Sequence, residues 1–330
     1  MKTLKLGAFF LLAATLGAAE VPAPERATVV LVAGAAGEAD YEPGFAEQVR
    51  RWEAAIARAG AKGITIGREA AGGEGNVADH DQLQRALAAE LTGGAGELWV
   101  VLIGHGTFDG KEAKFNLRGP DLTAGELALW LKECRRPLVV INTASASAPF
   151  IGQLAGPNRV VVTATRTGKE QNVTRFGGFL AEAMGEERTD LDQDGQTSLL
   201  EACLSASARV REFYKNEGRL ATEHALLDDN GDGLGTPLEW FRGTRATKKA
   251  RDGATLDGTR ARQFHLVPSL DEQRLTPEQR TRRDELEQAV EALRETKAGL
   301  DEADYYRQLE TLLLELARFV VPRGDADDKT

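Results

Sequence analysis

A twelve-residue acidic segment, Asp190–Glu201, has the residue types and spacing of a calcium-binding loop. Oxygen-bearing side chains stand at positions 1, 3, 5, 9 and 12, and Gly195 supplies the sharp turn at position 6. Calcium is a hard cation that takes about six to eight oxygen ligands, and this spacing provides them by wrapping the chain around the ion. The predicted ligands, with a backbone carbonyl at position 7, are Asp190, Asp192, Asp194, Gln196, Ser198 and Glu201.

A second acidic segment, Asp228–Glu239, repeats the pattern. Its predicted ligands are Asp228, Asn230, Asp232, Leu234 through its carbonyl, Thr236 and Glu239. Gly235 and Pro237 interrupt the helix that should leave this loop. The alternative for both segments is an acidic turn that is only solvated. We expect structural Ca²⁺ in both loops, tying elements to the end of the core.

A different chemistry is suggested by Gly104-His105-Gly106, which follows the apolar run Leu98–Ile103. A histidine between glycines can expose its ring and leave the following amides free. Such a histidine can act as a base if a neighbouring segment supplies a nucleophile. The alternative is a tight polar turn that carries a surface histidine.

The elements that position these residues alternate between strand and helix patterns. Apolar strand-like runs occur at residues 27–32, 64–66, 98–103, 138–141 and 160–162. Helical spacing of apolar residues occurs at 45–56, 81–91, 123–131, 176–184 and 198–214. Continuous apolar strands separated by helices predict an α/β fold with a mostly parallel sheet covered by helices on both faces. Ligand sites in such sheets lie at the carboxyl ends of the strands.

Three segments in this frame, Val32-Ala33-Gly34, Gly104-His105-Gly106 and Ile141–Ser145, resemble the legumain-like and caspase-like cysteine endopeptidases. The resemblance covers Thr28 to Thr165 and continues to about Gly235. It implies a caspase-like fold, with His105 as the base and the Gly106 amide as an oxyanion-hole donor. It also implies that the nucleophile position is residue 144 and that the wall of the substrate pocket includes Glu170.

The nucleophile position is vacant, because residue 144 is alanine and a methyl group cannot attack a carbonyl. The resemblance therefore implies an inactive peptidase homologue, a pseudoenzyme that serves as a binding or scaffold module for a protein or peptide ligand. The alternative is an active hydrolase in which Ser145 is the nucleophile and His105 the base. Cys203 lies in a helix pattern far along the chain and fits neither role.

Composition narrows the classes of partner. The chain has 330 residues, with 41 Lys and Arg against 51 Asp and Glu and a formal net charge of −10. An acidic balance argues against nucleic-acid binding, which needs a basic surface, and against a polybasic membrane anchor. Two cysteines exclude a disulfide-dense scaffold, and whether Cys134 and Cys203 form a bridge stays open.

The ends of the chain predict separate roles. Residues 1–19 combine a basic start with an eleven-residue apolar run, Leu6–Leu16, which is typical of a signal peptide and predicts export to the periplasm or beyond, with no membrane contact after its removal. Residues 20–241 form the predicted caspase-like domain with its two acidic loops, 242–275 a linker or mobile loop, 276–322 a two-helix hairpin and 323–330 a disordered tail.

The hairpin has two apolar stripes. The first contains Leu286, Val290, Leu293 and Leu300, and the second contains Leu309, Leu312, Leu313, Leu316 and Val320. Two interpretations stay open: the hairpin packs on the core, or it joins a second copy of the chain or another partner.

Overall fold

The computed structural model describes residues 26–68, 77–94, 96–251 and 254–319. The predicted signal peptide at 1–19, the predicted tail at 323–330 and Val320 lie outside these residues. None of the helices that the structure describes is long and apolar enough to cross a bilayer.

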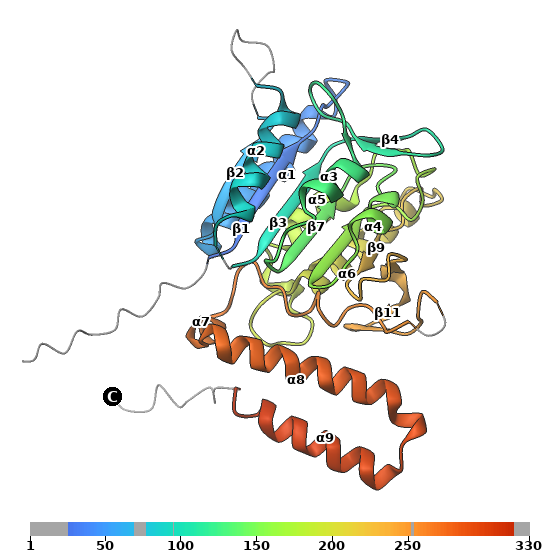
Figure 1. Cartoon of the computed structure of the whole chain (residues 1–330). Helices are drawn as coiled ribbons and strands as arrows, with labels where there is room; N and C mark the ends of the chain where they lie inside the picture. The colour runs from blue at the N-terminus through green and yellow to red at the C-terminus, as the bar shows by residue number, and fades with distance from the viewer. Residues whose placement is uncertain (1–25, 69–76, 95, 252–253, 320–330) are drawn as a thin grey trace, which may run out of the picture.

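A seven-stranded sheet forms the centre of the molecule (Figure 1). Its strands are β1 (Thr28–Ala33), β2 (Lys62–Ile66), β3 (Leu98–Ile103), β7 (Leu138–Asn142), β8 (Arg159–Thr163), β9 (Leu226–Asp228) and β10 (Thr236–Pro237), in the order β10-β9-β8-β7-β3-β1-β2. The five strands from β2 to β8 in this order are parallel, and β9 and β10 are antiparallel additions at one edge. β3 and β7 are buried along their whole length, as continuous apolar strands covered on both faces must be.

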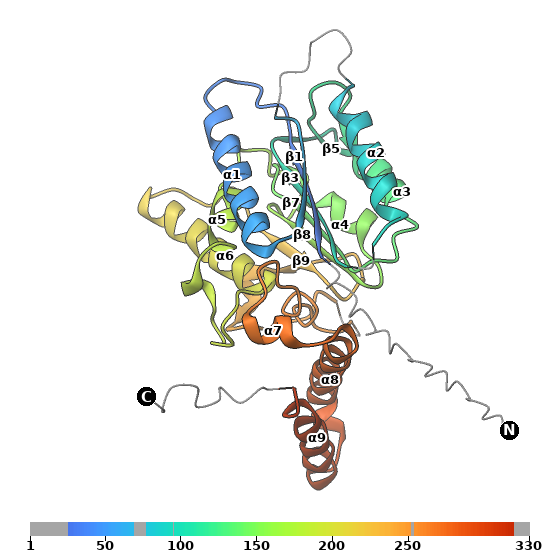
Figure 2. The ribbon, with the colours of Figure 1, turned by 90° about the vertical axis from the view of Figure 1, so that its left-hand side faces the viewer.

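Helices cover both faces of the sheet (Figure 2). One face packs against α1 (Glu42–Ala59), α5 (Phe176–Ala183) and α6 (Leu199–Asn216), and the other against α2 (Asp79–Leu91), α3 (Ala124–Trp130) and α4 (Pro149–Leu154). The sequence prediction of a mostly parallel sheet between two helical layers is confirmed. The capping box expected before α3 is present, because the Thr123 hydroxyl accepts from the Glu126 amide while the Glu126 carboxylate accepts from the Thr123 amide.

Smaller elements surround the sheet. β4 (Gly106–Phe108), β5 (Ala113–Phe115) and β6 (Leu122–Thr123) form a three-stranded sheet, and β11 (Phe241–Arg242) pairs with β12 (Arg245–Ala246). Two 3₁₀ helices, η1 (Glu187–Thr189) and η2 (Leu238–Trp240), flank the acidic loops. The β4–β6 sheet begins at Gly106, directly after His105. The histidine segment therefore lies between the end of β3 in the main sheet and the start of this smaller sheet.

The structure corrects the prediction that residues 242–275 form a linker or mobile loop. Part of it is buried against the sheet: Asp257, Ala261, Phe264 and Leu266 are all shielded from solvent, and Phe264 meets the edge of Trp99 at a centroid distance of 6.0 Å. The sequence pattern missed this because the few apolar residues are scattered among Gly and Arg without a period. Burial here depends on the long-range contact and not on local amphipathicity.

The C-terminal hairpin projects from the end of the domain (Figure 1). It follows the short α7 (Leu270–Arg274) and consists of α8 (Pro277–Thr296), η3 (Lys297–Gly299) and α9 (Glu302–Leu316), which confirms the predicted pair of helices and the break near Gly299. The stripe on α8 is buried at Leu286, Val290 and Leu293. On α9, Leu309, Leu312 and Leu316 are only half-buried, and Leu313 and Leu314 are exposed at 46% and 62%.

Candidate functional site

The carboxyl ends of β3 and β7 bring the segments that carry His105 and Ala144 together. The two strands are parallel neighbours with Leu102 opposite Asn142, so the segments at residues 104–106 and 143–145 emerge side by side. A Cβ placed on Gly106 would lie 2.3 Å from the Ser145 carbonyl oxygen and 3.4 Å from the Ala144 Cβ. Glycine is therefore required at 106 for this close approach, and Ala144 lies directly against it.

His105 is half-buried between two aromatic rings. Tyr41 and Phe45 meet it edge to face, with ring centroids 4.8 and 5.1 Å from the imidazole. The Nε2 atom is 3.1 Å from the carbonyl oxygen of Ala36. A carbonyl oxygen only accepts, so Nε2 donates in this contact and carries the proton. The ring is thus oriented by packing and by one backbone contact.

Ser145 is buried, and its hydroxyl is occupied on both sides by the backbone of Gly106. The Oγ atom accepts from the Gly106 amide at 3.1 Å and donates to the Gly106 carbonyl at 3.0 Å. In the described part of the chain no hydrogen bond joins Ser145 to His105. The amide that resembles an oxyanion-hole donor and the candidate alternative nucleophile therefore satisfy each other.

Ala144 is fully buried, and its amide donates to the Asn142 side chain at 3.1 Å. The next residue but one, Ala146, has φ +53°, a conformation that a non-glycine residue adopts at a cost. The sharp turn at the end of β7 is therefore built from the local backbone and from Asn142.

The predicted wall residue Glu170 contacts this turn, because its carbonyl accepts from the Ala146 amide at 2.7 Å. Its carboxylate pairs with His224 Nδ1 at 2.7 Å and accepts from the Arg166 amide. His224 was not identified from the sequence, since it stands alone and far from Glu170 along the chain. It lines a cavity of about 180 Å³ beside α6, together with Phe176 and Glu223.

Both cysteines are free thiols. Cys203 is buried in α6, and burial raises the pKa of its thiol. A raised pKa keeps the sulfur protonated and unreactive, so Cys203 has the character of a core residue.

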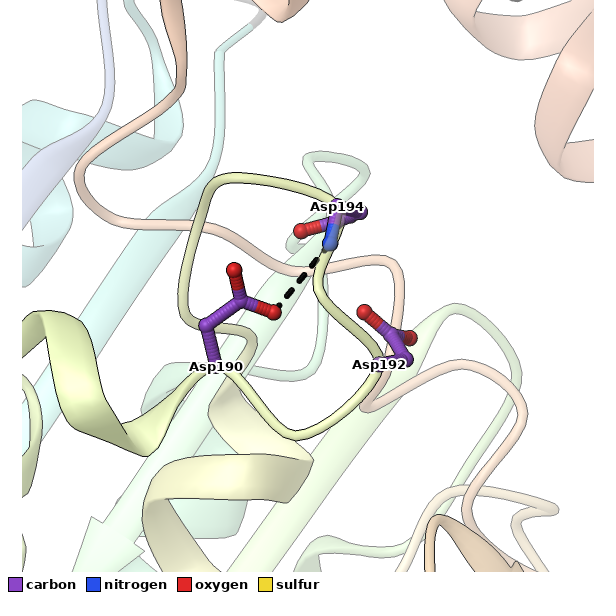
Figure 3. A group of neighbouring side chains, drawn as sticks. All are labelled: Asp190, Asp192 and Asp194. Carbon is purple, nitrogen blue, oxygen red and sulfur yellow. Dashed lines mark hydrogen bonds between the residues drawn. The ribbon is translucent and has the colours of Figure 1, made fainter.

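The first acidic loop gathers three carboxylates (Figure 3). One oxygen each of Asp190, Asp192 and Asp194 lies within 4.8 Å of the others. Partial burial, followed by the charges of Glu201, Asp194 and Asp190, raises the pKa of Asp192 to about 6. Gly195 has φ +89°, as the predicted turn at position 6 requires. Clustered carboxylates of this kind can hold a hard cation.

The remaining predicted ligands of the first loop close it. Glu201 is buried and accepts from the amides of Leu191 and Asp192 at 2.7 and 3.1 Å, and from the Ser198 hydroxyl at 2.8 Å. Ser198 and Glu201 also form the capping box of α6, so one pair of residues begins the helix and ends the loop.

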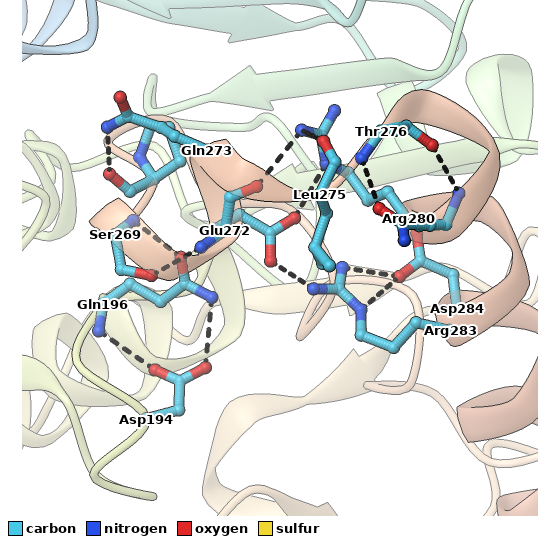
Figure 4. A network of polar contacts seen from close by, with 12 residues as sticks. Asp194, Gln196, Ser269, Glu272, Gln273, Leu275, Thr276, Arg280, Arg283 and Asp284 are labelled. Atoms are coloured by element: carbon cyan, nitrogen blue, oxygen red, sulfur yellow. Dashed lines mark hydrogen bonds and ion pairs between the residues drawn. The ribbon is translucent and has the colours of Figure 1, made fainter. Parts of the chain in front are cut away.

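A chain of polar contacts leads from this loop to the C-terminal region (Figure 4). The Gln196 side chain donates to Asp194 at 3.2 Å and accepts from the amide of Ser269, the N-cap of α7, at 3.0 Å. Within α7, Glu272 forms ion pairs with Arg280 and Arg283 of α8. The first loop and the hairpin are therefore connected through α7.

The second acidic loop gathers Asp228, Asn230 and Asp232 around two glycine turns. Asp228 accepts from the Gly231 and Gly233 amides at 3.0 and 2.7 Å. Asp232 accepts from the amide of the exposed Leu234 at 2.9 Å. The chain continues into β10 and the short η2, so the loop lacks an exit α-helix, as Gly235 and Pro237 predicted.

The last two predicted ligands of this loop, Thr236 and Glu239, lie in different environments. Thr236 is buried, and its hydroxyl donates to Asp257 at 2.6 Å. Glu239 is exposed on η2, where it lines the hollow beside α6 together with Arg211. Asp257 was not identified from the sequence, because it lies in the segment that the pattern assigned to a linker.

Comparison with known proteins finds structural likeness only. No family model matches the chain, and no curated protein matches its sequence. Similar solved structures include the Drosophila initiator caspase Dronc, with 12% identity and a TM-score of 0.39 over 64% of this chain and 82% of that chain. Caspase-1 from Spodoptera frugiperda has 9% identity and a TM-score of 0.41, over 64% of this chain and 91% of that chain. A structural-genomics protein from Geobacter sulfurreducens has 10% identity and a TM-score of 0.40, over 64% of this chain and 97% of that chain. At these TM-scores nothing about the site follows from the likeness.

Proposed function

We propose that the chain is an exported caspase/legumain-like domain without cysteine-peptidase activity, which acts as a calcium-stabilised binding or scaffold module for a protein or peptide ligand. The observation that carries the proposal is the fully buried Ala144 beside Gly106 at the neighbouring strand ends. A thiol hydrolase needs its sulfur, its base and its oxyanion donors to converge. Here the sulfur is missing and the donor amide is occupied by Ser145.

The alternative hydrolase, with Ser145 as nucleophile and His105 as base, needs a different arrangement. The Ser145 hydroxyl donates to the Gly106 carbonyl, and the His105 Nε2 proton points to Ala36. An active serine instead gives its proton to a base within hydrogen-bond reach. These contacts favour the inactive module over the hydrolase.

Labelling of the purified full-length protein with activity probes tests this choice. We expect no labelling by cysteine-directed peptide probes and none by a fluorophosphonate serine probe. Serine-probe labelling that disappears in Ser145→Ala and persists in Ser147→Ala would overturn the inactive assignment. Ser147 is a matched control because it is also buried and hydrogen-bonded near the same strand end, to Thr165.

Calcium as the structural cofactor is supported by the three carboxylates of the first loop and by the buried Glu201 that closes it. A carboxylate in partial burial needs a compensating charge or a proton, and a divalent cation supplies that charge. Isothermal titration of the metal-free protein with CaCl₂ measures the binding. Heat of binding indistinguishable from buffer would remove calcium from the proposal.

The hairpin is the part of the proposed module that contacts a second copy of the chain. Its α9 exposes Leu313 and Leu314 and leaves the rest of the predicted stripe only half-buried. Exposed leucines on one helix favour association. Light scattering of the full-length protein tests the assignment.

A further inference from the structure

The two acidic loops share one internal hydrogen bond between positions 1 and 6, although they lie in different surroundings. In each, the carboxylate at position 1 accepts from the amide of the glycine at position 6: Asp190 from Gly195 at 2.9 Å, and Asp228 from Gly233 at 2.7 Å. Both glycines have positive φ, +89° and +77°. The glycine at position 6 of each loop therefore turns back to the first carboxylate, and the rest of the two loops can be compared position by position.

The first loop is closed by Glu201 at position 12. One of its carboxylate oxygens accepts from the amides at positions 2 and 3, which belong to Leu191 and Asp192. The other oxygen accepts from the hydroxyl at position 9, which belongs to Ser198. The twelfth residue thus returns to the start of the loop and holds it shut.

In the second loop the same three contacts are made by Asp257. Its Oδ1 accepts from the amides at positions 2 and 3, which belong to Asp229 and Asn230, at 3.0 and 3.1 Å. Its Oδ2 accepts from the hydroxyl at position 9, which belongs to Thr236, at 2.6 Å. Contact for contact, Asp257 occupies the place that the twelfth residue occupies in the first loop, although Glu239 is the twelfth residue of this one.

The second loop itself holds the segment that carries Asp257. The Asp229 carboxylate at position 2 accepts from the amides of Gly258 and Ala261 at 2.9 and 2.8 Å. The first loop has Leu191 at that position, and a leucine side chain cannot accept such hydrogen bonds. The second loop therefore differs from the first in two linked ways. It has a carboxylate, Asp229, at position 2, and the contacts of the twelfth residue are made by the distant Asp257.

The second loop also contains a carboxylate oxygen without a partner. Asp232 Oδ2 is shielded from solvent and has no hydrogen-bond partner in the described residues. In the first loop the corresponding aspartate, Asp194, receives the side-chain amide of Gln196, and the second loop has Leu234 instead. A buried carboxylate oxygen without a donor is unfavourable unless a cation meets it.

Charge balance points the same way. Asp228 and Asp257 are exposed at only 1% and 3%, and no Lys, Arg or His of the described chain forms an ion pair with either. Two buried carboxylates without a cationic side chain leave this cluster short of positive charge.

We propose that Asp257, and not Glu239, is the closing carboxylate of a calcium site formed with Asp228, Asn230, Asp232 and the carbonyl of Leu234. This inference rests on the calcium binding proposed above and changes the residues that provide it. Because Asp257 comes from another segment, a cation here joins the loop to the chain that continues into the core residues Ala261 and Phe264. Calcium then fastens the C-terminal region to the sheet.

Calorimetric titration of the full-length protein and two isosteric variants tests the assignment. We expect the parent protein to bind two calcium ions. Asp257→Asn should weaken one of them at least tenfold and leave the other unchanged, whereas Glu239→Gln should bind both like the parent. Glu201→Gln is the matched control, since it should weaken the other ion.

Hydrogen exchange of the unaltered protein gives a second measurement that does not depend on how a variant folds. Calcium should slow amide exchange in 228–236 and also in 254–262, and leave 238–243 unchanged. Loss of one ion in Glu239→Gln, or protection that omits 254–262, overturns the role of Asp257 while calcium binding stands. A parent protein that binds no calcium overturns both proposals together.

Discussion

The strand-end site and the acidic loops differ in how their buried polar atoms are satisfied. At the strand ends the Ser145 hydroxyl and the Gly106 backbone satisfy each other, and His105 is engaged with the Ala36 carbonyl. In the loops, carboxylates converge on one another, and the buried Asp232 Oδ2 has no partner in the described residues. A buried polar atom is stabilised by a partner, so the unpaired Asp232 oxygen lies in the less favourable of the two environments. Of the two regions, only the second loop has a shielded carboxylate oxygen without a partner among the described residues.

Removal of calcium should have the largest effect. A ligand that binds only the folded state at a hundredfold excess over its Kd stabilises by about 2.7 kcal/mol. For a chain of 330 residues, with an unfolding entropy of about 2.1 cal/mol/K per residue, that corresponds to roughly 4 °C in Tm for each ion. We expect EDTA to lower Tm by this amount relative to 1 mM CaCl₂, measured by differential scanning calorimetry, and Glu201→Gln to reduce the difference. Coincident melting curves would contradict the assignment of both loops.

Ser145→Ala should destabilise the protein without changing any catalytic readout. The substitution leaves the buried Gly106 amide and carbonyl without their partner, which costs about 1–3 kcal/mol. Urea unfolding of the variant and the parent at equal calcium measures this loss. An unchanged midpoint would show that the hydroxyl is not the structural tie between β3 and β7.

Ala144→Cys tests whether the vacant position is the nucleophile position. A thiol beside a histidine is more easily ionised and reacts faster with an electrophile. We expect the variant to react with iodoacetamide roughly tenfold faster than the double variant Ala144→Cys/His105→Ala, a ratio of about 1.4 kcal/mol. Equal rates for the two variants would place residue 144 outside the reach of His105.

The smallest effect on stability is expected at α9. Leu313 and Leu314 are largely exposed, so their replacement by serine should change the free energy of unfolding of the chain by less than about 0.5 kcal/mol. The double variant should nevertheless show a lower mass than the parent by light scattering, because α9 is the proposed contact between copies. A parent protein that already has the mass of one chain argues against that contact.

Much of the fold follows from local patterns. The runs Leu98–Ile103 and Leu138–Ile141 are strands because a short stretch of apolar residues between polar turns is stable only when both of its faces are covered. The capping box at Thr123 and the pair of C-terminal helices follow from signals that act within a few residues. Such elements could be predicted because the interactions that specify them are near in sequence.

The candidate sites were predictable only in part. The Asp190–Glu201 pattern predicts which carboxylates cluster in the first loop, because these residues lie at fixed short spacings within one loop. The same rule assigns Glu239 to the second loop, where η2 carries it to the exposed side. The segment around Asp257 and Ala261 has no periodic pattern of apolar residues, so its burial could not be predicted from the sequence.

The sequence by itself therefore determined the parallel sheet, the alanine at position 144 and the two acidic loops, because each depends on residue identity or on short spacing. Only the tertiary structure decided that Ser145 pairs with Gly106, that His224 meets Glu170 and that Asp257 closes the second loop. Each of these contacts joins segments that are distant along the chain. No local propensity encodes such a meeting, which arises when the packed sheet and helices bring the segments together.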